Sequence, residues 1–387
     1  MTTSVSKWLP ATAGTGEFFI VVTPDTGGSF ARQLDDLFAE YQRACAEHTL
    51  DAGTAVTATV FLSDSANQEA DLRCHPGFIA LTRGGAAVTV IQQQPVGRKV
   101  GLLVCHVRRA AGSATRTALA VAGTKAGAAG LAVRTDGYRF VYLRNLRADD
   151  ARDAGAQTER LMGEAQVGIQ SNDVALATVI RTWIYVHDLD AHYPAVSAAR
   201  NRVFARHGIT AQTGFPASTG IEGRSSDHAD LVLMDAFAVA GLKPGQSRAM
   251  TAPRHMNPTV EYGVTFERGR ELVFGDRRHL YVSGTASISH EGEILHRGDV
   301  VNQTRRAIAN VAALLANSGA APADMRYLLV YLRDAVDADD VAAVLADSPL
   351  ATVPRIIVHA AVCRPGWLVE MEGVAIDGRG ETGFAAF

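Results

Sequence analysis

The sequence predicts a fold of mixed strands and helices with a weak internal repeat, and three observations support this. A strand, a helix and a second strand follow one another near the start of the chain. The same order returns near its end. Three segments also resemble one another, because each is an alternating strand that ends in aspartate: VFLSD (60–64), IYVHD (184–188) and VYLRD (330–334).

The elements of the N-terminal region follow from their apolar spacing. Residues 17–25 form a short apolar run that is typical of a strand. A helix is expected from Phe30 to His48, and a second strand at residues 55–64. Apolar side chains recur on one stripe of this helix: Phe30, Leu34, Leu37, Phe38 and Tyr41.

The C-terminal region repeats this order with further strands. A strand at 279–289 precedes a helix from Val300 to Ser318, which begins after Asp299 and stops at Gly319. The remaining elements are a strand at 325–334, a short helix at 339–346, and strands at 355–362 and 367–376.

A polar, helix-like stretch between Arg147 and Asn172 separates the two regions. We therefore place a boundary near Asp150 and expect one domain of residues 1–150 and another of residues 151–387.

The composition is ordinary for a folded protein, and it excludes several classes of function. The 387 residues are 47% hydrophobic and 20% charged, and the net charge of −3 disfavours binding to nucleic acid or to anionic membranes. There is no apolar run of about 18 residues and no signal-peptide pattern, so we expect a cytoplasmic protein. The four cysteines lack CxxC spacing and the histidines lack HExxH spacing, which predicts reduced thiols and no metal site.

Two glutamates lie in an otherwise apolar strand near the C-terminus. Glu370 and Glu372 are two residues apart, so they share one face of the strand. Carboxylates are rarely buried unless paired, so this face meets water, a basic partner or a ligand. Apolar surroundings raise the pKa of a glutamate, which makes Glu370 a candidate general acid near neutral pH. Arg355 and Cys363 in the same pair of strands add a cation and a thiol.

Three other segments have a composition that suits ligand binding, each with a non-functional alternative. The Gly, Ser and Thr-rich segment that contains Thr219 and Gly220 either holds a carboxylate or is a solvent loop. Arginine recognises carboxylates, so the segment with Tyr262 and Arg268 is either a binding segment or simply solvated. Small residues around Ala286 either admit a ligand close to the backbone or form a bulge.

The C-terminal string RIIVHAAVCRPGWLVEME (355–372) resembles the signature of the Rid superfamily, in which an arginine precedes the first of two strand glutamates by fifteen residues. From about Ile180 onward the chain also resembles the chorismatases, larger relatives with this fold. The matching motifs are RTWIYVHDLDAHYPAVSAARNRVF, PASTGIEG, EYGVTFERG, SGTASI and VCRPGWLVEMEG. The resemblance implies an α+β fold in which helices pack on a Rid-like mixed sheet. It also implies a degenerate Rid-like domain at 1–150 and a Rid-like catalytic domain at 151–387.

The resemblance implies that the chain converts chorismate to pyruvate and 3-hydroxybenzoate without a cofactor or metal. Glu370 would protonate the terminal methylene of the enolpyruvyl ether, whereas Glu372 would stay ionised or pair with an arginine. Arg355 would hold one substrate carboxylate and Arg268 the second. Cys363 resembles the cysteine of hydroxybenzoate-forming members. The other expected substrate-binding residues are Tyr262, Ala286, Thr219 and Gly220.

Three other functions remain open from the sequence. A hydrolytic chorismatase would release pyruvate and a dihydroxycyclohexadienoate. A Rid-type imine hydrolase would need Arg355 and Glu370 but not the central motifs, and a non-catalytic protein would only bind carboxylates. The expected partner is a small molecule, chorismate. Because an internal repeat can supply the neighbouring subunit of a Rid trimer, both a monomer and a homotrimer are compatible with the sequence.

Overall fold

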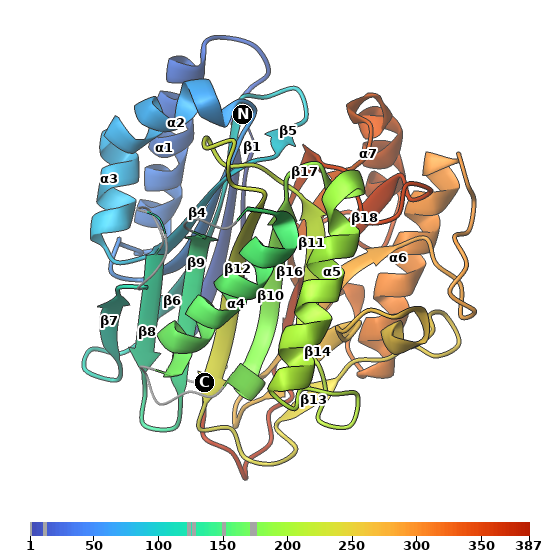
Figure 1. Ribbon diagram of the computed structural model, residues 1–387. Helices are drawn as coiled ribbons and strands as arrows, with labels where there is room; N and C mark the ends of the chain where they lie inside the picture. The colour runs from blue at the N-terminus through green and yellow to red at the C-terminus, as the bar shows by residue number, and fades with distance from the viewer. Residues whose placement is uncertain (1, 11–13, 122–124, 126–128, 149–151, 171–175) are drawn as a thin grey trace.

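The computed structural model describes residues 2–10, 14–121, 125, 129–148, 152–170 and 176–387. In this part the chain forms three mixed sheets whose outer sides carry helices, which confirms the predicted α+β class (Figure 1). Within the same ranges, no helix combines the length and hydropathy that crossing a bilayer requires.

The first unit is a five-stranded sheet with the order β1-β2-β6-β3-β4, in which β3 and β4 run parallel. Helix α1 packs on β2 and β6. The elements are β1 (Thr2–Trp8), β2 (Gly16–Thr23), α1 (Phe30–Glu47), β3 (Ala55–Leu62), α2 (Ser65–Cys74), α3 (Pro76–Arg83), β4 (Ala87–Gln92) and β6 (Val100–Arg108).

The second unit is a six-stranded sheet with the order β11-β10-β12-β9-β8-β7, in which β10 and β11 run parallel. Helices α4 and α5 lie side by side on it (Figure 1). The elements are β7 (Thr115–Leu119), β8 (Ala129–Arg134), β9 (Arg139–Arg147), α4 (Ala154–Gln170), η1 (Leu176–Thr178), β10 (Val179–Val186), α5 (Leu189–Arg206), β11 (Ala217–Glu222) and β12 (Val232–Ala240).

The third unit is a sheet with the order β13-β14-β15-β18-β16-β17-β5, in which β16 and β17 run parallel. Its last member, β5 (Gln94–Pro95), comes from the first unit. The other elements are β13 (Ser247–Ala249), η2 (Thr259–Tyr262), β14 (Gly269–Val273), β15 (Arg278–Ala286), α6 (Val300–Asn317), η3 (Pro322–Asp324), β16 (Met325–Leu332), η4 (Ala335–Asp337), α7 (Ala338–Ala346), β17 (Arg355–His359) and β18 (Val369–Asp377).

The three units share one topology. In each, a helix leads to a strand, a second helical segment leads to a strand parallel to it, and the last strand inserts beside the first of this pair. The three similar segments of the sequence end the equivalent strands β3, β10 and β16. The repeat that the sequence indicates is therefore present three times in the described part, where two halves were expected.

The expected domain boundary near residue 150 does not follow the sheets. Strand β9, which precedes it, pairs with β12, which follows it, so both belong to the second unit. The polar stretch that suggested a linker contains α4, whose apolar side is buried on β9 and β12. Polarity there marks the exposed face of an amphipathic helix. Asp150 itself lies outside the described residues.

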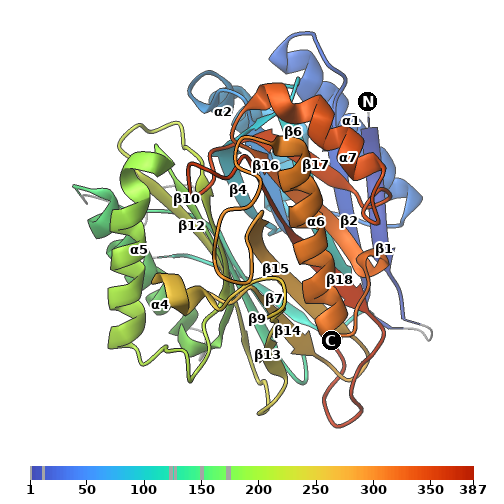
Figure 2. The same ribbon diagram turned by 90° about the vertical axis from the view of Figure 1, so that its right-hand side faces the viewer.

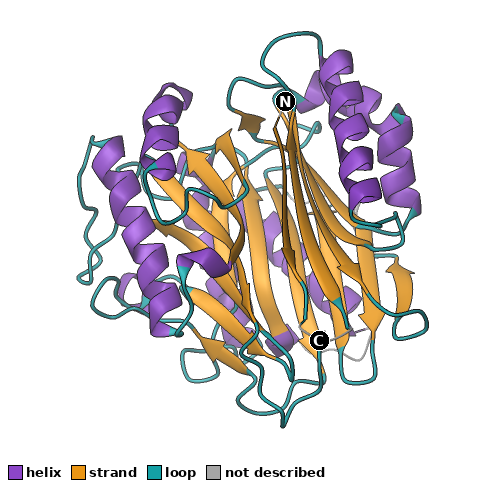
Figure 3. Ribbon diagram, turned by 180° about the vertical axis from the view of Figure 1, so that it is seen from behind, coloured by secondary structure: helices purple, strands orange, loops and turns teal. Residues whose placement is uncertain are grey.

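The three units contact one another in every pairing. Strand β5 of the first unit extends the third sheet, β4 contacts β9 of the second unit, and β11 of the second unit contacts β15 of the third. The inner faces of the three sheets share one apolar core, which includes Phe19, Phe237 and Tyr327. Figures 2 and 3 show the strands gathered at the centre and the helices outside them.

The predicted helix boundaries near both ends of the chain are confirmed to within a residue. Ser29 caps α1 by accepting a hydrogen bond from the Arg32 backbone N–H. Asp299 caps α6 by accepting from the Asn302 backbone N–H, as its position before the helix predicted. Gly319, with a φ of 72°, follows the end of α6 in a conformation that favours glycine.

Candidate active site

The candidate site is built on the last strand of the third unit. Strand β18 lies between β15 and β16, and its register places Glu370 opposite Ala286 on one neighbour and Tyr331 on the other. Glu372 follows on the same face. The two glutamates are 4% and 1% exposed, respectively. A buried carboxyl group requires partners or a proton, and the two glutamates meet this requirement differently.

The carboxylate of Glu372 accepts hydrogen bonds from four side chains. The Trp183 indole N–H and the Tyr331 hydroxyl donate to Oε1 over 2.7 and 3.0 Å. The Arg181 guanidinium and the Thr219 hydroxyl contact Oε2. Three of these donors belong to β10 and β11 of the second unit. This buried ion pair therefore joins the second unit to the third and leaves Glu372 no free lone pair for chemistry.

Glu370 is buried without comparable donors, and no described residue donates a hydrogen bond to its carboxyl group. Burial raises the pKa of Glu370 to about 8, and the charge of Glu372 adds to this rise. The positive charges of Arg181 and Arg268 oppose it. The carboxyl oxygen Oε1 lies directly against the backbone of Gly284, where a methyl group would overlap it. Glu370 is thus mostly protonated at pH 7 and able to donate that proton.

The Glu370 carboxyl group faces a cavity of about 790 Å³, open solvent included, between the second and third units. Helix α5 and strand β11 form one wall, and β15, β18 and the loop before β18 form the other. Figure 2 shows α5 on the left, with β15 and β18 to its right. The lining residues are Tyr193, Arg200, Ser218, Gly220, Val264, Phe266, Arg268, Gly284, Ala286, Ile288, Cys363, Arg364, Trp367 and Glu370.

Three arginines give this cavity an excess of positive charge. Arg200 on α5 is 2% exposed, and its buried Nε and Nη2 have no hydrogen-bond acceptor among the described residues. Arg268 donates from Nε and Nη2 to the Asn257 carbonyl oxygen over 3.2 and 3.0 Å. Arg364 donates to the Gly292 carbonyl oxygen over 3.1 Å. Because guanidinium groups bind carboxylates in a bidentate manner, the unpaired Arg200 points to an anionic ligand.

Cys363 lies in the cavity wall near both Glu370 and Tyr193. Burial raises the pKa of its thiol to about 12, with a further rise from the charge of Glu370. A hydrogen bond with Tyr193 and the charges of two arginines oppose this shift. The thiol therefore stays protonated at neutral pH, which excludes it as a thiolate nucleophile.

The structure brings most of the residues expected in the site together. Arg268, Gly220 and Ala286 line the cavity with Glu370 and Cys363. Small residues at SGTAS do allow a close approach to the backbone, but the approaching group is the Glu370 carboxyl.

Two other expected residues are not among the described residues that line the cavity. Thr219 contacts Glu372, so it supports the site from behind. Tyr262 ends η2, and its side chain lies outside the described part.

Arg355 is the expectation that the structure contradicts. Arg355 is the first residue of β17. Tyr331 of the intervening strand β16 pairs with both Glu370 and Val358, so Val358 is the β17 residue level with Glu370, and Arg355 lies three positions away from it. Its guanidinium donates to the Leu350 carbonyl oxygen over 3.0 Å, and it does not line the cavity. A separation of fifteen residues places Arg355 and Glu370 on two strands that follow one another in the sequence. It does not determine whether the two side chains lie at the same end of the sheet.

Sequence reasoning missed the residues on the opposite wall. Tyr193 and Arg200 are seven residues apart in α5, which places them two turns apart on one helical face. Both lie in the motif RTWIYVHDLDAHYPAVSAARNRVF, so their spacing was a usable signal.

Three further lining residues on the wall of Glu370 were also missed. Arg364 and Trp367 follow Cys363 in the terminal motif, and Gly284 belongs to SGTASI.

Comparison with known proteins finds sequence similarity over parts of this chain. Residues 273–377 match the family model described as Endoribonuclease L-PSP, which covers most of the third unit. A chorismatase of Streptomyces hygroscopicus is 27% identical over 260 residues, which are 62% of this chain and 72% of the relative. A 3-hydroxybenzoate synthase of the same organism is 30% identical over 179 residues, 42% of this chain and 51% of the relative.

A solved structure extends this relationship to the first unit. The crystal structure of a chorismatase at 1.08 Å resolution aligns with a TM-score of 0.65 and 20% identity. The alignment covers 94% of this chain and 100% of that one. The arrangement of three sheets is therefore a fold found before, including the N-terminal third, whose sequence carried no matching motif.

Proposed function

We propose that this chain, which is related to the chorismatases in sequence and shares their fold, is an enzyme that cleaves chorismate and releases pyruvate. One observation carries the proposal: a buried, protonated glutamate, Glu370, shares a cavity with an arginine, Arg200, whose donors have no acceptor among the described residues. Chorismate is a dianion with an acid-labile enol ether. Its binding therefore needs a cation, and its cleavage needs an acid.

The cations of the cavity provide the binding step. Arg200 takes one carboxylate of chorismate, because its Nε and Nη2 form a ready pair of donors. Arg268 supplies positive charge for the second, although part of its donor capacity is used by Asn257. Phe266 and Trp367 in the same cavity offer flat apolar surfaces to the cyclohexadiene ring.

The reaction begins with a proton transfer from Glu370. The proton adds to the terminal methylene of the enolpyruvyl group, and the ether carbon becomes an oxocarbenium ion. The ionised Glu370 left behind is stabilised by the nearby charges of Arg181 and Arg268. Attack by water gives a hemiketal, which collapses to pyruvate and the dihydroxycyclohexadienoate. Attack by the neighbouring ring hydroxyl gives a cyclic ketal instead. The bond between that hydroxyl oxygen and the ring then breaks as the adjacent ring carbon loses its proton to the ionised Glu370, and the resulting aromatic hemiketal collapses to pyruvate and 3-hydroxybenzoate. Burial of the site favours the initial proton transfer, because it keeps the acid neutral until the substrate is bound.

We propose 3-hydroxybenzoate as the ring product. Conversion of chorismate to pyruvate and 3-hydroxybenzoate consumes no net water, whereas the hydrolytic route to a dihydroxycyclohexadienoate consumes one water molecule. Cys363 lies beside the acid and provides a neutral, weakly polar surface there. We infer that this surface keeps water from the cation, so that the ring hydroxyl reacts instead.

One observation weighs against a Rid-type imine hydrolase. An imine hydrolase of the Rid type would need Arg355 and Glu370 in one site, and these two residues lie apart.

The three units supply one another with neighbours within a single chain. We therefore propose that the protein acts as a monomer, with one active site between its second and third units.

The test is incubation of the purified protein with chorismate, followed by quantification of pyruvate and identification of ring products by chromatography with mass detection. Equal amounts of pyruvate and 3-hydroxybenzoate are expected. A dihydroxycyclohexadienoate in place of 3-hydroxybenzoate would retain the cleavage and overturn the proposed product. Absence of pyruvate would overturn the function.

A further inference from the structure

A second cavity lies away from the proposed active site, between the first and second units. Its volume is about 590 Å³, open solvent included. Val107 on β6 and Val133 on β8 contribute to its two sides. It shares three lining residues, Val56, Val107 and Tyr142, with the cavity at the centre of the three sheets.

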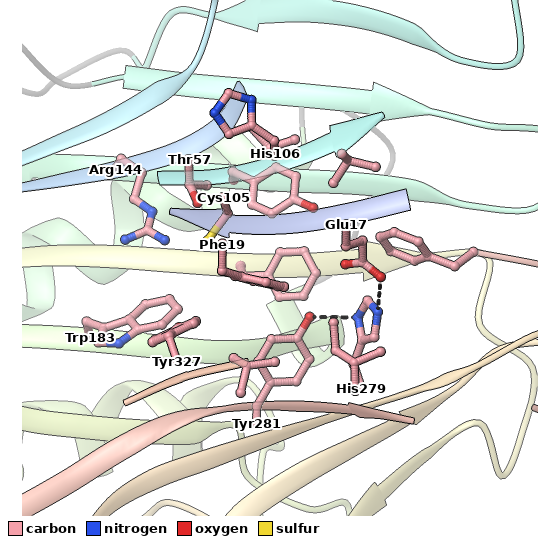
Figure 4. Close-up of a pocket in the computed structure, with 17 residues that line it drawn as sticks. Glu17, Phe19, Thr57, Cys105, His106, Arg144, Trp183, His279, Tyr281 and Tyr327 are labelled. Carbon is pink, nitrogen blue, oxygen red and sulfur yellow. Dashed lines mark hydrogen bonds and ion pairs between the residues drawn. The ribbon is translucent and has the colours of Figure 1, made fainter. Parts of the chain in front are cut away.

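The central cavity is aromatic, as Figure 4 shows. Phe19, Trp183, Tyr281 and Tyr327 extend into it from strands of all three units. Within it, the His279 ring is hydrogen-bonded to both Glu17 and Tyr281. The second cavity therefore adjoins an interior that is lined largely by aromatic side chains.

The second cavity has two cations and no acidic residue among its described lining residues. Arg116 donates from Nη2 to the carbonyl oxygens of Ala55 and Gly84. Arg109 donates from Nη1 to the Thr15 hydroxyl and to Phe387 O, and its buried Nε has no acceptor among the described residues. The buried Nε of Arg109 is thus a donor without a partner on a residue that lines this cavity, and an anionic ligand could accept from it.

Burial lowers the pKa of both guanidinium groups, and this loss of hydration is only partly offset by acids beyond the wall. Asp51 acts on Arg116, and Glu17 and Asp276 act on Arg109. None of these three acids lines the cavity.

Two rings complete the cavity beside these cations. Phe140 and Tyr142 line the cavity together with Arg109 and Arg116. The Tyr142 ring stacks on Phe237 with centroids 4.8 Å apart. The guanidinium carbon of Arg109 lies over the Phe140 ring, 5.7 Å from the centroid of that ring. One side of the cavity is therefore cationic and the adjoining side is aromatic.

We propose that this cavity binds a small aromatic monocarboxylate, with its carboxylate between Arg109 and Arg116 and its ring against Phe140 and Tyr142. An aromatic acid matches both sides, since a carboxylate accepts from guanidinium groups and a planar ring stacks on aromatic side chains. The site is separate from the cavity of Glu370 and does not depend on the proposed reaction.

The experiment is calorimetric titration of the full-length Arg200→Gln variant with benzoate, because this substitution weakens carboxylate binding in the Glu370 cavity. One benzoate site is expected to remain. Arg116→Gln, added to this background, should weaken binding at least tenfold. Arg326→Gln is the matched control, since Arg326 also donates to two backbone carbonyl oxygens but lines neither cavity.

A second variant keeps the test decisive if Arg116→Gln impairs folding. Ala114→Glu places a carboxylate in the cavity wall without removing any arginine and should abolish benzoate binding. Acetate and the neutral benzamide should each bind at least tenfold more weakly than benzoate. The proposal is overturned if benzoate does not bind, if Ala114→Glu binds it as the parent does, or if benzamide binds equally well.

Discussion

Glu370 and Glu372 leave the same face of β18, yet only Glu372 is bound by donors. Ionising two carboxyl groups on the same buried face of a strand is energetically unfavourable, because the like charges repel and neither is hydrated. Arg181 stabilises the charge on Glu372, and that charge in turn raises the pKa of Glu370. The charge of Glu372 thus adds to the effect of burial in keeping Glu370 protonated.

Replacing Glu370 with glutamine should remove turnover while leaving binding intact. Glutamine keeps the shape and a hydrogen-bond donor but cannot transfer a proton, so kcat should fall by about 100- to 10,000-fold. Pyruvate release measures turnover, and equilibrium titration with chorismate measures binding. Turnover of Glu370→Gln within threefold of the wild type would exclude Glu370 as the proton donor.

The pH dependence of turnover should report the raised pKa of Glu370. The acid must be protonated, so kcat should be level below about pH 8 and fall about tenfold per unit above it. Glu372→Gln removes a charge that raises this pKa, so the falling limb should move to lower pH. Glu381→Gln removes an exposed acid that pairs with Arg248 and should leave the limb in place. A limb that does not move in Glu372→Gln would contradict the coupling.

Replacing Arg200 with glutamine should weaken chorismate binding. Loss of one charge-assisted pair costs about 1.5–3 kcal/mol, so the Kd should rise about 10- to 100-fold. Arg202→Gln is the control, because Arg202 lies on the same helix but is exposed and pairs with Glu159. Equal binding by the two variants would show that Arg200 does not hold the substrate.

The strands and helices near both chain ends were predictable because local periodicity decides them. The apolar stripe of α1 and the caps at Ser29 and Asp299 are short-range signals. The number of units was not predictable in this way. In the second unit α4 is long and polar on its exposed side, so it resembled a linker, and only the pairing of β9 with β12 shows that it belongs inside one sheet.

Half of the site could be predicted for a similar reason. Glu370 lies in β18, where alternation places it on the same face as Glu372, and Cys363 lies seven residues earlier in the loop that leads into this strand. Arg200 comes from the other unit, and no local pattern says which helix faces β18. Arg355 failed as a prediction because sequence distance to Glu370 does not encode the register of β16 between them.

Replacing Gly284 with alanine should disable the site without a change in charge. The added methyl group would overlap the Glu370 carboxyl, so Glu370 must move out of the cavity position that it occupies. We expect kcat to fall at least 100-fold, because small misplacement of a reacting group costs about this much. Gly163→Ala, where a methyl group meets no atom within 4 Å, is the control and should retain wild-type activity. Full activity in Gly284→Ala would contradict the position of Glu370.

The last prediction concerns the ring product and uses two cysteines with similar environments. Burial raises the pKa of both Cys363 and Cys105, to about 12 and about 11, but only Cys363 lies in the cavity with Glu370. Cys363→Ala leaves space for a water molecule beside the oxocarbenium ion, so part of the product should change from 3-hydroxybenzoate to a dihydroxycyclohexadienoate. Pyruvate release should change less than the product ratio, because the proton donor is untouched. Cys105→Ala should leave the ratio unchanged, and the same ratio in both variants would show that the Cys363 thiol does not control access of water.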